Sequence, residues 1–166
     1  EDIFINTEYG RMHIIKSGAD TAPPLLLLHA AAMSGFSWYK NVSRLLGKYQ
    51  VYAVDNIGEI GKSELKDLSY YPDNGKKLAD LYHELMNQLD LDSAFVLAAS
   101  NGGFIASNLA FYYPEKIKGI ILLGPQGLTP LTNKSIFMMS IGSMYPFPFI
   151  RQWVINWSIG TDPSVT

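Results

Sequence analysis

The sequence contains no cysteine, which excludes disulfides, thiolate nucleophiles and cysteine-based metal sites. Because disulfides are rare in reducing compartments, this absence fits a cytoplasmic location, and no signal peptide is recognisable at the start of the chain. The apolar, uncharged stretch 135–150 is short for a membrane span and is interrupted by Pro146 and Pro148. We therefore expect a soluble, cytoplasmic protein without a membrane span.

Charged residues are also scarce. They make up 17% of the 166 residues, and thirteen basic against fifteen acidic residues give a net charge of −2. The usual share is about a quarter. No basic run or stripe occurs, so neither nucleic acid nor an anionic membrane is expected as a partner. The chain is 48% hydrophobic, and its length suits one domain with a core of its own.

The hydrophobic pattern predicts strands that alternate with helices. Short apolar runs predict strands at 25–28, 50–54, 94–97 and 117–123, and helical spacing predicts helices at 36–48, 74–89 and 104–113. The first sixteen residues predict a hairpin of strands 3–6 and 12–16. A hairpin followed by repeated strand–helix units predicts an α/β fold, with a mainly parallel sheet and helices on both faces.

The stretch AFVLAASNGG, residues 94–103, is the first candidate site. A strand that turns sharply into a helix around a single serine exposes that serine as a nucleophile. Ser100 occupies this position, and the small residues Ala98, Gly102 and Gly103 would prevent clashes in such a turn. The alternative is an ordinary strand–helix turn in which Ser100 caps the helix.

Other polar or small residues also follow the predicted strands. His29 with Ala30 and Ala31 ends one strand, Asp55 ends the next, and the GPQG turn at 124–127 follows the last. In open parallel sheets, ligands bind at the carboxyl ends of the strands. This clustering favours a functional site at that edge of the sheet.

Three segments together resemble the amino-terminal half of an α/β-hydrolase. LLLLHAAA resembles the family's strand ending in His-Gly, DNIGEIGKS resembles its Asp-x-x-Gly-x-Gly-x-Ser loop, and LAASNGG resembles its nucleophile elbow. The resemblance covers residues 1–125, which we interpret as part of the hydrolase core. Residues 126–166 would begin a helical lid, since two apolar segments, 134–144 and 147–160, predict helices there. The alternative for these segments is ordinary core.

The resemblance implies a role for each matching residue. Ser100 would be the nucleophile, and the backbone N–H groups of Asn101 and Ala31 would form the oxyanion hole, with Ala30 the next candidate after Ala31. Two family glycines are replaced, by Ala30 and Ala98. Both replacements are small, and backbone donors need no particular side chain. No metal or organic cofactor is implied.

The remaining titratable candidates favour structural roles. His29 stands at a strand end, where the family uses its histidine structurally, and Asp55 matches an aspartate that organises its loop. His13, in the hairpin, and His83, in a helix, are interpreted as surface residues or as residues behind the site.

No histidine follows Ser100, and the only later acids are Glu115 and Asp162. A serine nucleophile needs a general base and an orienting acid, which the family supplies after the serine. The strand at 117–123 would also be an exposed edge. We therefore expect a fragment whose partner is the missing carboxyl-terminal part of the same hydrolase, or a swapped copy of itself.

The resulting hypothesis is a serine hydrolase that cleaves a small apolar carboxylic ester through an acyl-enzyme on Ser100. The 166 residues alone should turn over esters poorly. One alternative is a hydrolase of activated carbon–carbon bonds, which uses the same triad. The other is a non-catalytic domain that binds a small apolar ligand.

Overall fold

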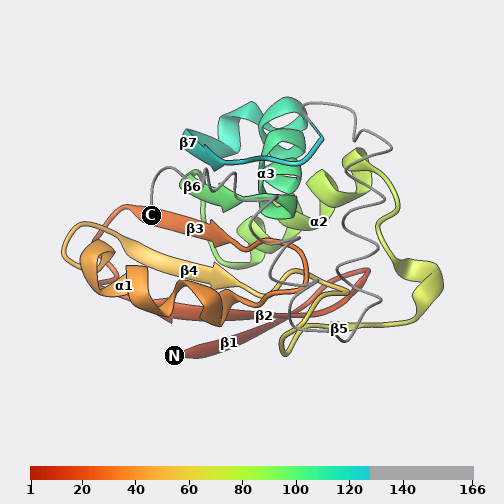
Figure 1. Cartoon of the computed structure of the whole chain (residues 1–166), viewed down its shortest axis with the longest axis horizontal. Helices are drawn as coiled ribbons and strands as arrows, with labels where there is room; N and C mark the ends of the chain where they lie inside the picture. Colours follow the sequence, from red (N-terminus) through yellow and green to blue (C-terminus); the bar gives the residue numbers. More distant parts are fainter. Residues whose placement is uncertain (128–166) are drawn as a thin grey trace, which may run out of the picture. The chain divides into compact units, whose positions relative to one another are not determined.

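The structure, a computed structural model, describes residues 1–127 (Figure 1). The strands are β1 (Asp2–Asn6), β2 (Gly10–Ser17), β3 (Pro24–Leu28), β4 (Gln50–Val54), β5 (Glu64–Leu65), β6 (Ala94–Ala99) and β7 (Ile117–Leu123). The helices are α1 (Tyr39–Leu45), α2 (Gly75–Gln88) and α3 (Asn101–Tyr112), with 3-10 turns η1 (Gly35–Trp38), η2 (Leu68–Tyr70) and η3 (Pro114–Lys116). The predicted lid falls outside the described residues except for its first two, and the domain boundary at 125 stays a prediction.

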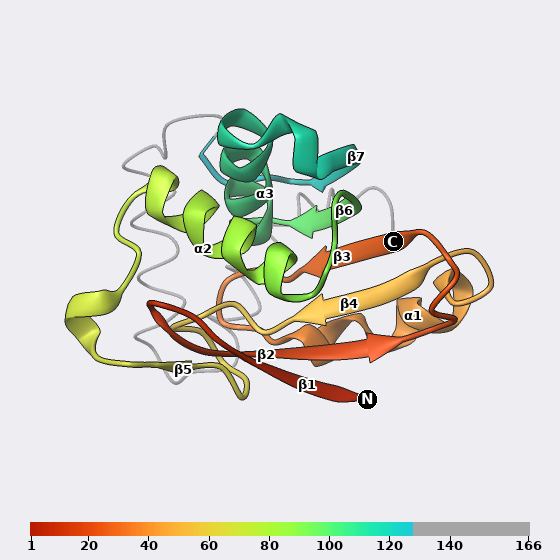
Figure 2. The same ribbon diagram turned by 180° about the vertical axis from the view of Figure 1, so that it is seen from behind.

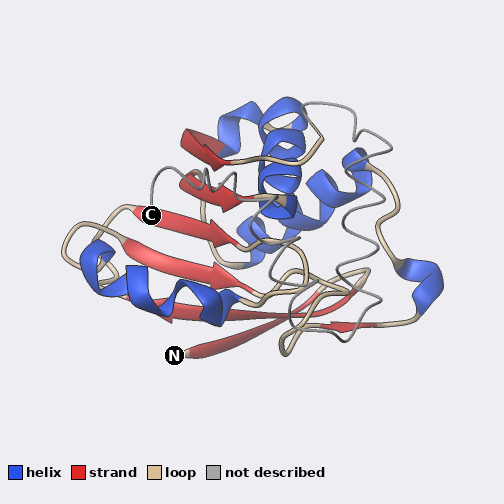
Figure 3. Ribbon diagram, in the orientation of Figure 1, coloured by secondary structure: helices blue, strands red, loops and turns tan. Residues whose placement is uncertain are grey.

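The strands form one seven-stranded sheet in the order β1-β2-β4-β3-β6-β7, with β5 paired to β2 (Figure 3). The hairpin β1–β2 is antiparallel, and β2 also runs antiparallel to β4. From β4 onward the pairs are parallel, with Leu28 opposite Val54 on one side and Ala98 on the other. The predicted hairpin and mainly parallel sheet are therefore confirmed.

Helices cover both faces of the sheet, with α1 in front in Figure 1 and α2 and α3 in front in Figure 2. Strand alternation explains this arrangement. In β3, Leu25 and Leu27 face a small cluster with Trp38, whereas Leu26 and Leu28 face the larger core beneath α2 and α3. All four leucines are buried, and burying each stabilises the fold by about 1.5–3 kcal/mol.

The predicted helix at 74–89 corresponds closely to α2. Asn74 caps it by accepting a hydrogen bond from the Lys77 N–H (3.0 Å), and its inner face buries Leu81, Tyr82 and Leu85. A Cβ on Gly75 would lie 2.0 Å from the Asn108 Oδ1. The start of α2 therefore packs directly on α3, which holds the two helices together over the sheet.

Two helix boundaries differ from the prediction. The expected helix at 36–48 consists of η1 and the short α1, which ends at Leu45, just before Gly47. Helix α3 begins at Asn101, three residues before the expected Phe104, and includes Gly102 and Gly103 in its first turn. Glycine lowers helix propensity, but the first turn of α3 packs so closely on its neighbours that a Cβ at Gly102 or Gly103 would clash.

Strand β7 ends the sheet of residues 1–127, because no described strand pairs with its outer edge. Its side chains include Ile121, 61% exposed, and Leu123, 50% exposed. An unpaired apolar edge strand is a site of association with other chains. The exposed edge predicted for this strand is confirmed within the described part of the chain.

Candidate active site

Three segments meet at the carboxyl edge of the parallel strands: the loops after β3 and β4, and the start of α3 after β6. The Gly102 N–H donates to the His29 carbonyl (3.1 Å), which joins α3 to the loop after β3. The Asn56 N–H donates to the His29 Nε2 (2.9 Å), which joins that loop to the one after β4. The clustering predicted from the sequence is therefore present.

Ser100 lies at the sharp turn from β6 into α3. Its φ of 48° and ψ of −111° are strained for a residue with a side chain. The backbone is held from both sides, because its N–H donates to the Leu123 carbonyl and its carbonyl accepts from Gly103, Phe104 and Gln126. The hydroxyl makes no capping hydrogen bond. This geometry contradicts the capping interpretation and leaves the hydroxyl available.

Two glycines make this turn possible. A Cβ on Gly102 would lie 2.4 Å from the Leu28 carbonyl oxygen, and one on Gly103 would lie 2.6 Å from the Pro125 Cβ. Ala98, two residues before Ser100, is fully buried. The prediction that small residues prevent clashes in the elbow is confirmed for both glycines.

The two N–H groups assigned to the oxyanion hole are available. Asn101 is the first residue of α3, so its N–H has no partner within the helix. No residue of the described part accepts a hydrogen bond from the N–H of Asn101 or of Ala31. Ala32, next to Ala31, has a φ of 58°, a left-handed conformation that is strained for alanine. The oxyanion role itself stays a prediction.

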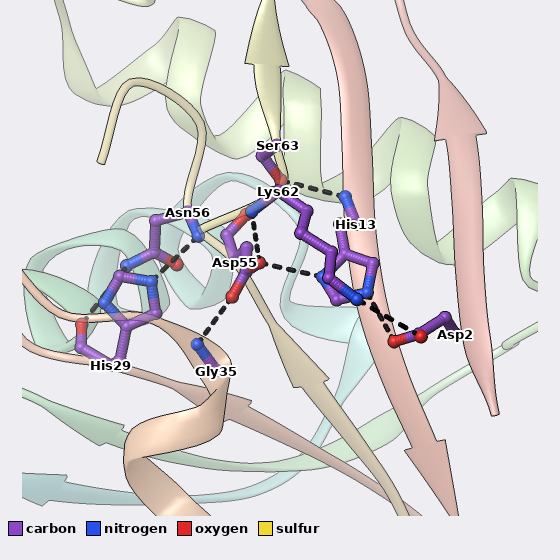
Figure 4. Close-up of polar contacts among 8 residues, drawn as sticks. All are labelled: Asp2, His13, His29, Gly35, Asp55, Asn56, Lys62 and Ser63. Carbon is purple, nitrogen blue, oxygen red and sulfur yellow. Dashed lines mark hydrogen bonds and ion pairs between the residues drawn. The ribbon is translucent and has the colours of Figure 1, made fainter. Parts of the chain in front are cut away.

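His29 is a structural residue, as the sequence favoured. It is fully buried, and its Nε2 accepts the Asn56 N–H (Figure 4). Its Nδ1 lies 2.8 Å from the Ala30 carbonyl. An Nε2 that accepts and an Nδ1 that donates define a neutral imidazole with both nitrogens occupied. His29 is therefore not available as a base for Ser100.

Asp55 organises the loops behind the site (Figure 4). One carboxylate oxygen accepts the Gly35 N–H (2.7 Å) and the other accepts the Lys62 N–H (2.7 Å). The Ser63 hydroxyl donates to the Asp55 carbonyl (2.6 Å) and closes the loop. The structural interpretation of Asp55 is confirmed.

Of the two interpretations of His13, a surface residue or a residue behind the site, the structure supports the second. His13 is 1% exposed, with Nδ1 2.8 Å from Asp55 and Nε2 2.7 Å from Asp2 (Figure 4). Hydrogen bonds from His13 and then Lys62 hold the pKa of Asp2 below its usual value. The register of the hairpin could have indicated the contact between His13 and Asp2. Phe4 pairs with His13 across the strands, and Asp2, two residues before Phe4, lies on the same face of its strand.

The third histidine lies at the opposite end of helix α3 from the elbow. His83 of α2 stacks on Tyr113, with ring centroids 4.0 Å apart. Tyr113 follows the end of α3, whereas Ser100 precedes its start. None of the three histidines therefore bonds to Ser100.

Glu59 is a site residue that the sequence did not reveal. Its carboxylate accepts the Ala32 N–H (2.7 Å) and the Asn101 side-chain amide (3.1 Å). Glu59 stands in the loop matched to the Asp-x-x-Gly-x-Gly-x-Ser pattern. That match needs correction, because two residues separate Gly58 from Gly61 where the pattern has one.

A cavity of about 250 Å³ adjoins the elbow. Its lining, which does not include Ser100, consists of Asn56, Ile57, Tyr71, Pro72, Asp73, Asn74, Leu78, Tyr82, Asn101, Phe104, Ile105, Gln126 and Gly127. Within this lining, the Tyr82 hydroxyl donates to the Asn56 Oδ1 (2.7 Å), and burial raises the pKa of Tyr82. Tyr82 is therefore a neutral hydrogen-bond donor in the lining of the cavity.

Within residues 1–127, no group of three or more histidine or acidic side chains could hold a metal ion. No helix in this part is long and apolar enough to cross a membrane.

The profile of the family described as "alpha/beta hydrolase fold" matches residues 23–157. Two similar proteins come from Bacillus subtilis (strain 168). "Uncharacterized carboxylesterase nap" is 34% identical over 126 residues, which cover 75% of this chain and 41% of that protein. "Carboxylesterase YbfK" is 30% identical over 125 residues, with the same two coverages of 75% and 41%.

Among solved structures, the naproxen esterase (carboxylesterase NP) of Bacillus subtilis superposes with a TM-score of 0.83 at 28% identity, over 95% of this chain and 53% of that one. The chain thus spans about two fifths of the length of the curated relatives, at 41%. The predicted partial α/β-hydrolase fold is confirmed by the sheet order and by these matches. The chain belongs to the alpha/beta hydrolase fold family.

Proposed function

We propose that the full-length protein hydrolyses carboxylic esters and that Ser100 is its nucleophile. The observation that carries the proposal is the conformation of Ser100, with a φ of 48° and a hydroxyl free of capping bonds at the start of a helix. Strain of this kind persists where the surrounding structure holds it for function. The names of the two curated relatives, both carboxylesterases, support the same reaction class.

The reaction proceeds in two steps. The Ser100 oxygen attacks the ester carbonyl carbon while its proton passes to a general base, and the alcohol then leaves with that proton as the acyl-enzyme forms. Water repeats the attack and releases the acid. In both steps the N–H groups of Ala31 and Asn101 bind the oxyanion, and each such donor is worth about 3–4 kcal/mol in the transition state.

The base must come from outside the residues described above. His13, His29 and His83 have other partners, and no histidine follows Ser100 in the sequence. The family order places the acid and the histidine after the nucleophile, and the curated relatives are longer than the matched part, which covers 41% of them. We infer that the remainder of the full-length protein supplies both residues.

The cavity beside the elbow supports a small, largely apolar substrate. Leu78, Phe104 and Ile105 contribute apolar walls, while Asn101 and Gln126 add amide groups near Ser100. At about 250 Å³ the space is slightly below the usual range for sites that bind drug-sized ligands. An ester with a short or compact acyl group therefore fits best.

A fluorophosphonate probe, which labels activated serines, tests the proposal on the full-length protein. We expect one label on the peptide that carries Ser100, and loss of both labelling and ester hydrolysis in Ser100→Ala. Ser107→Ala is the matched control, because that hydroxyl donates only to the Gly103 carbonyl within α3 (2.8 Å). If a folded wild-type protein binds a small apolar ligand but shows neither labelling nor hydrolysis, it is a binding protein and the proposal is wrong.

A further inference from the structure

Glu59 connects the two segments that carry the proposed oxyanion donors. Its Oε2 accepts the Ala32 N–H (2.7 Å), one residue after Ala31. Its Oε1 accepts a hydrogen bond from the side-chain Nδ2 of Asn101 (3.1 Å). The backbone N–H of Asn101 is the second proposed oxyanion donor. These segments follow different strands, β3 and β6, so one carboxylate links the two sides of the oxyanion hole.

The backbone around Glu59 explains why the carboxylate points there. The Glu59 N–H donates to the Asn56 carbonyl (3.2 Å) and closes a tight turn. Gly58, inside this turn, has a φ of 78°, and a Cβ there would lie 2.7 Å from the Tyr71 ring. Only glycine meets both demands readily. The turn is therefore specified by sequence and projects Glu59 out of the loop.

The start of this turn is anchored in the core. The Asn56 side chain donates to the His29 carbonyl (3.1 Å) and accepts from the Tyr82 hydroxyl (2.7 Å). His29 in turn accepts the Gly102 N–H at the start of α3. The turn that carries Glu59 is therefore held by the core, and a side chain on such a turn can fix the distance between the two segments that it joins.

The partners of Glu59 are all N–H donors. No ion pair within residues 1–127 includes it. Its bond to the Ala32 N–H also supports a left-handed residue, whose φ of 58° is strained for an L-amino acid. A charged acceptor bonds to N–H groups about twice as strongly as a neutral one. The carboxylate therefore holds the Ala31–Ala32 peptide in its strained orientation.

We propose that Glu59 is a positioning residue that sets the separation of the Ala31 and Asn101 N–H groups. The inference rests on the proposed function, since only that reaction forms an oxyanion between them. Bonds to the oxyanion strengthen in the transition state rather than in the bound substrate. Loss of Glu59 therefore lowers kcat and leaves KM nearly unchanged.

The first test compares Glu59→Ala and Glu59→Gln with wild type in the full-length protein. A glutamine side chain offers one acceptor and one donor group, whereas both partners are donors, so Glu59→Gln also loses one of the two bonds. Because small misplacements of catalytic groups are costly, we expect kcat to fall about 10- to 100-fold in both variants. Glu64→Gln is the control, since Glu64 pairs with Arg11 at an exposed position.

The decisive test is a chemical swap of the pair. Asn101→Asp alone places two carboxylates against each other and should lower kcat. Combining it with Glu59→Gln restores both bonds, because the introduced amide oxygen accepts the Ala32 N–H and the amide N–H donates to the introduced carboxylate. We expect the double variant to regain most of the kcat lost by either single variant. The backbone N–H at position 101 is unchanged throughout.

Two outcomes would overturn the inference: wild-type kcat in Glu59→Ala, or losses that multiply in the double variant instead of cancelling. Failure of the proposed function looks different. In that case the wild-type protein is neither labelled at Ser100 nor active on esters, whereas failure of the Glu59 inference leaves Ser100 labelled and the enzyme active.

Discussion

The close approach of α3 to β3 predicts a large effect of one methyl group at Gly102. A Cβ there would lie 2.4 Å from the Leu28 carbonyl oxygen and 2.8 Å from that of His29. Both atoms belong to the backbone at the end of the central strand and cannot rotate away. Either the strand end or the start of α3 must therefore move in Gly102→Ala.

Opposing effects decide the sign of the change. Alanine favours a helix over glycine by about 1 kcal/mol, whereas overpacking a tight contact costs about 1–3 kcal/mol or more. Because the overlap involves two fixed carbonyls rather than one flexible side chain, overpacking should win. Subtracting the helix gain leaves a cost of about 0–2 kcal/mol, and we expect Gly102→Ala to lower the free energy of unfolding by an amount near the upper end, about 2 kcal/mol.

Gly47→Ala is the matched control, because a Cβ at Gly47 has no neighbour within 4 Å. Its stability should stay the same or rise by up to about 1 kcal/mol. Guanidinium unfolding of the two full-length variants measures the difference in their free energies of unfolding, provided that both curves have the same slope of free energy against denaturant concentration. Equal stability of the two variants would show that α3 does not rest on β3 as described. Displacement of α3 should also lower kcat, since Asn101 moves with it.

Two further predictions concern the network behind the site. Tyr82→Phe leaves the Asn56 Oδ1 without its donor, which should cost about 1–3 kcal/mol of unfolding free energy; an unchanged denaturation midpoint would contradict this. Asp2→Asn should destabilise the protein at neutral pH, because bonds from His13 and Lys62 lower the pKa of Asp2 in the folded state from 3.8. A carboxylate whose pKa is lower in the folded than in the unfolded state stabilises the fold at pH values above its unfolded pKa, and this stabilisation is lost as the pH falls through its folded pKa. The difference in stability between wild type and Asp2→Asn should therefore disappear below pH 3.8. A difference that persists at lower pH would argue against it.

The sequence predicted the strands better than the helices. The run at 50–54 became β4 with unchanged bounds, because a strand buried on both faces leaves a continuous apolar signal. The expected helix at 36–48 forms only in part, as the 3-10 turn η1 and the short α1 that ends at Leu45. Phe36 and Tyr39, which supplied its apolar spacing, are 65% and 55% exposed and stack on each other, with ring centroids 5.1 Å apart. Apolar spacing therefore did not report burial there.

In the candidate site, too, some residues could be predicted from the sequence and others could not. Ser100 and its glycines were predictable, because a sharp turn between strand and helix imposes local demands on residue size. Glu59 was not, because its partners lie 27 and 42 residues away along the chain and nothing in its neighbourhood indicates them. The sequence left His13 between a surface position and one behind the site, because its burial depends on how the hairpin packs against the loop that Asp55 holds.

The hydrogen bonds of Asp55 have a consequence for motion. This carboxylate joins segments 42, 20 and 7 residues away, at His13, Gly35 and Lys62, in a chain without a single covalent cross-link. Freeing one of these segments leaves a buried carboxylate under-bonded, which is costly. The hairpin and the two loops beside the elbow should therefore open as one unit, so that the rim of the site moves cooperatively or remains closed.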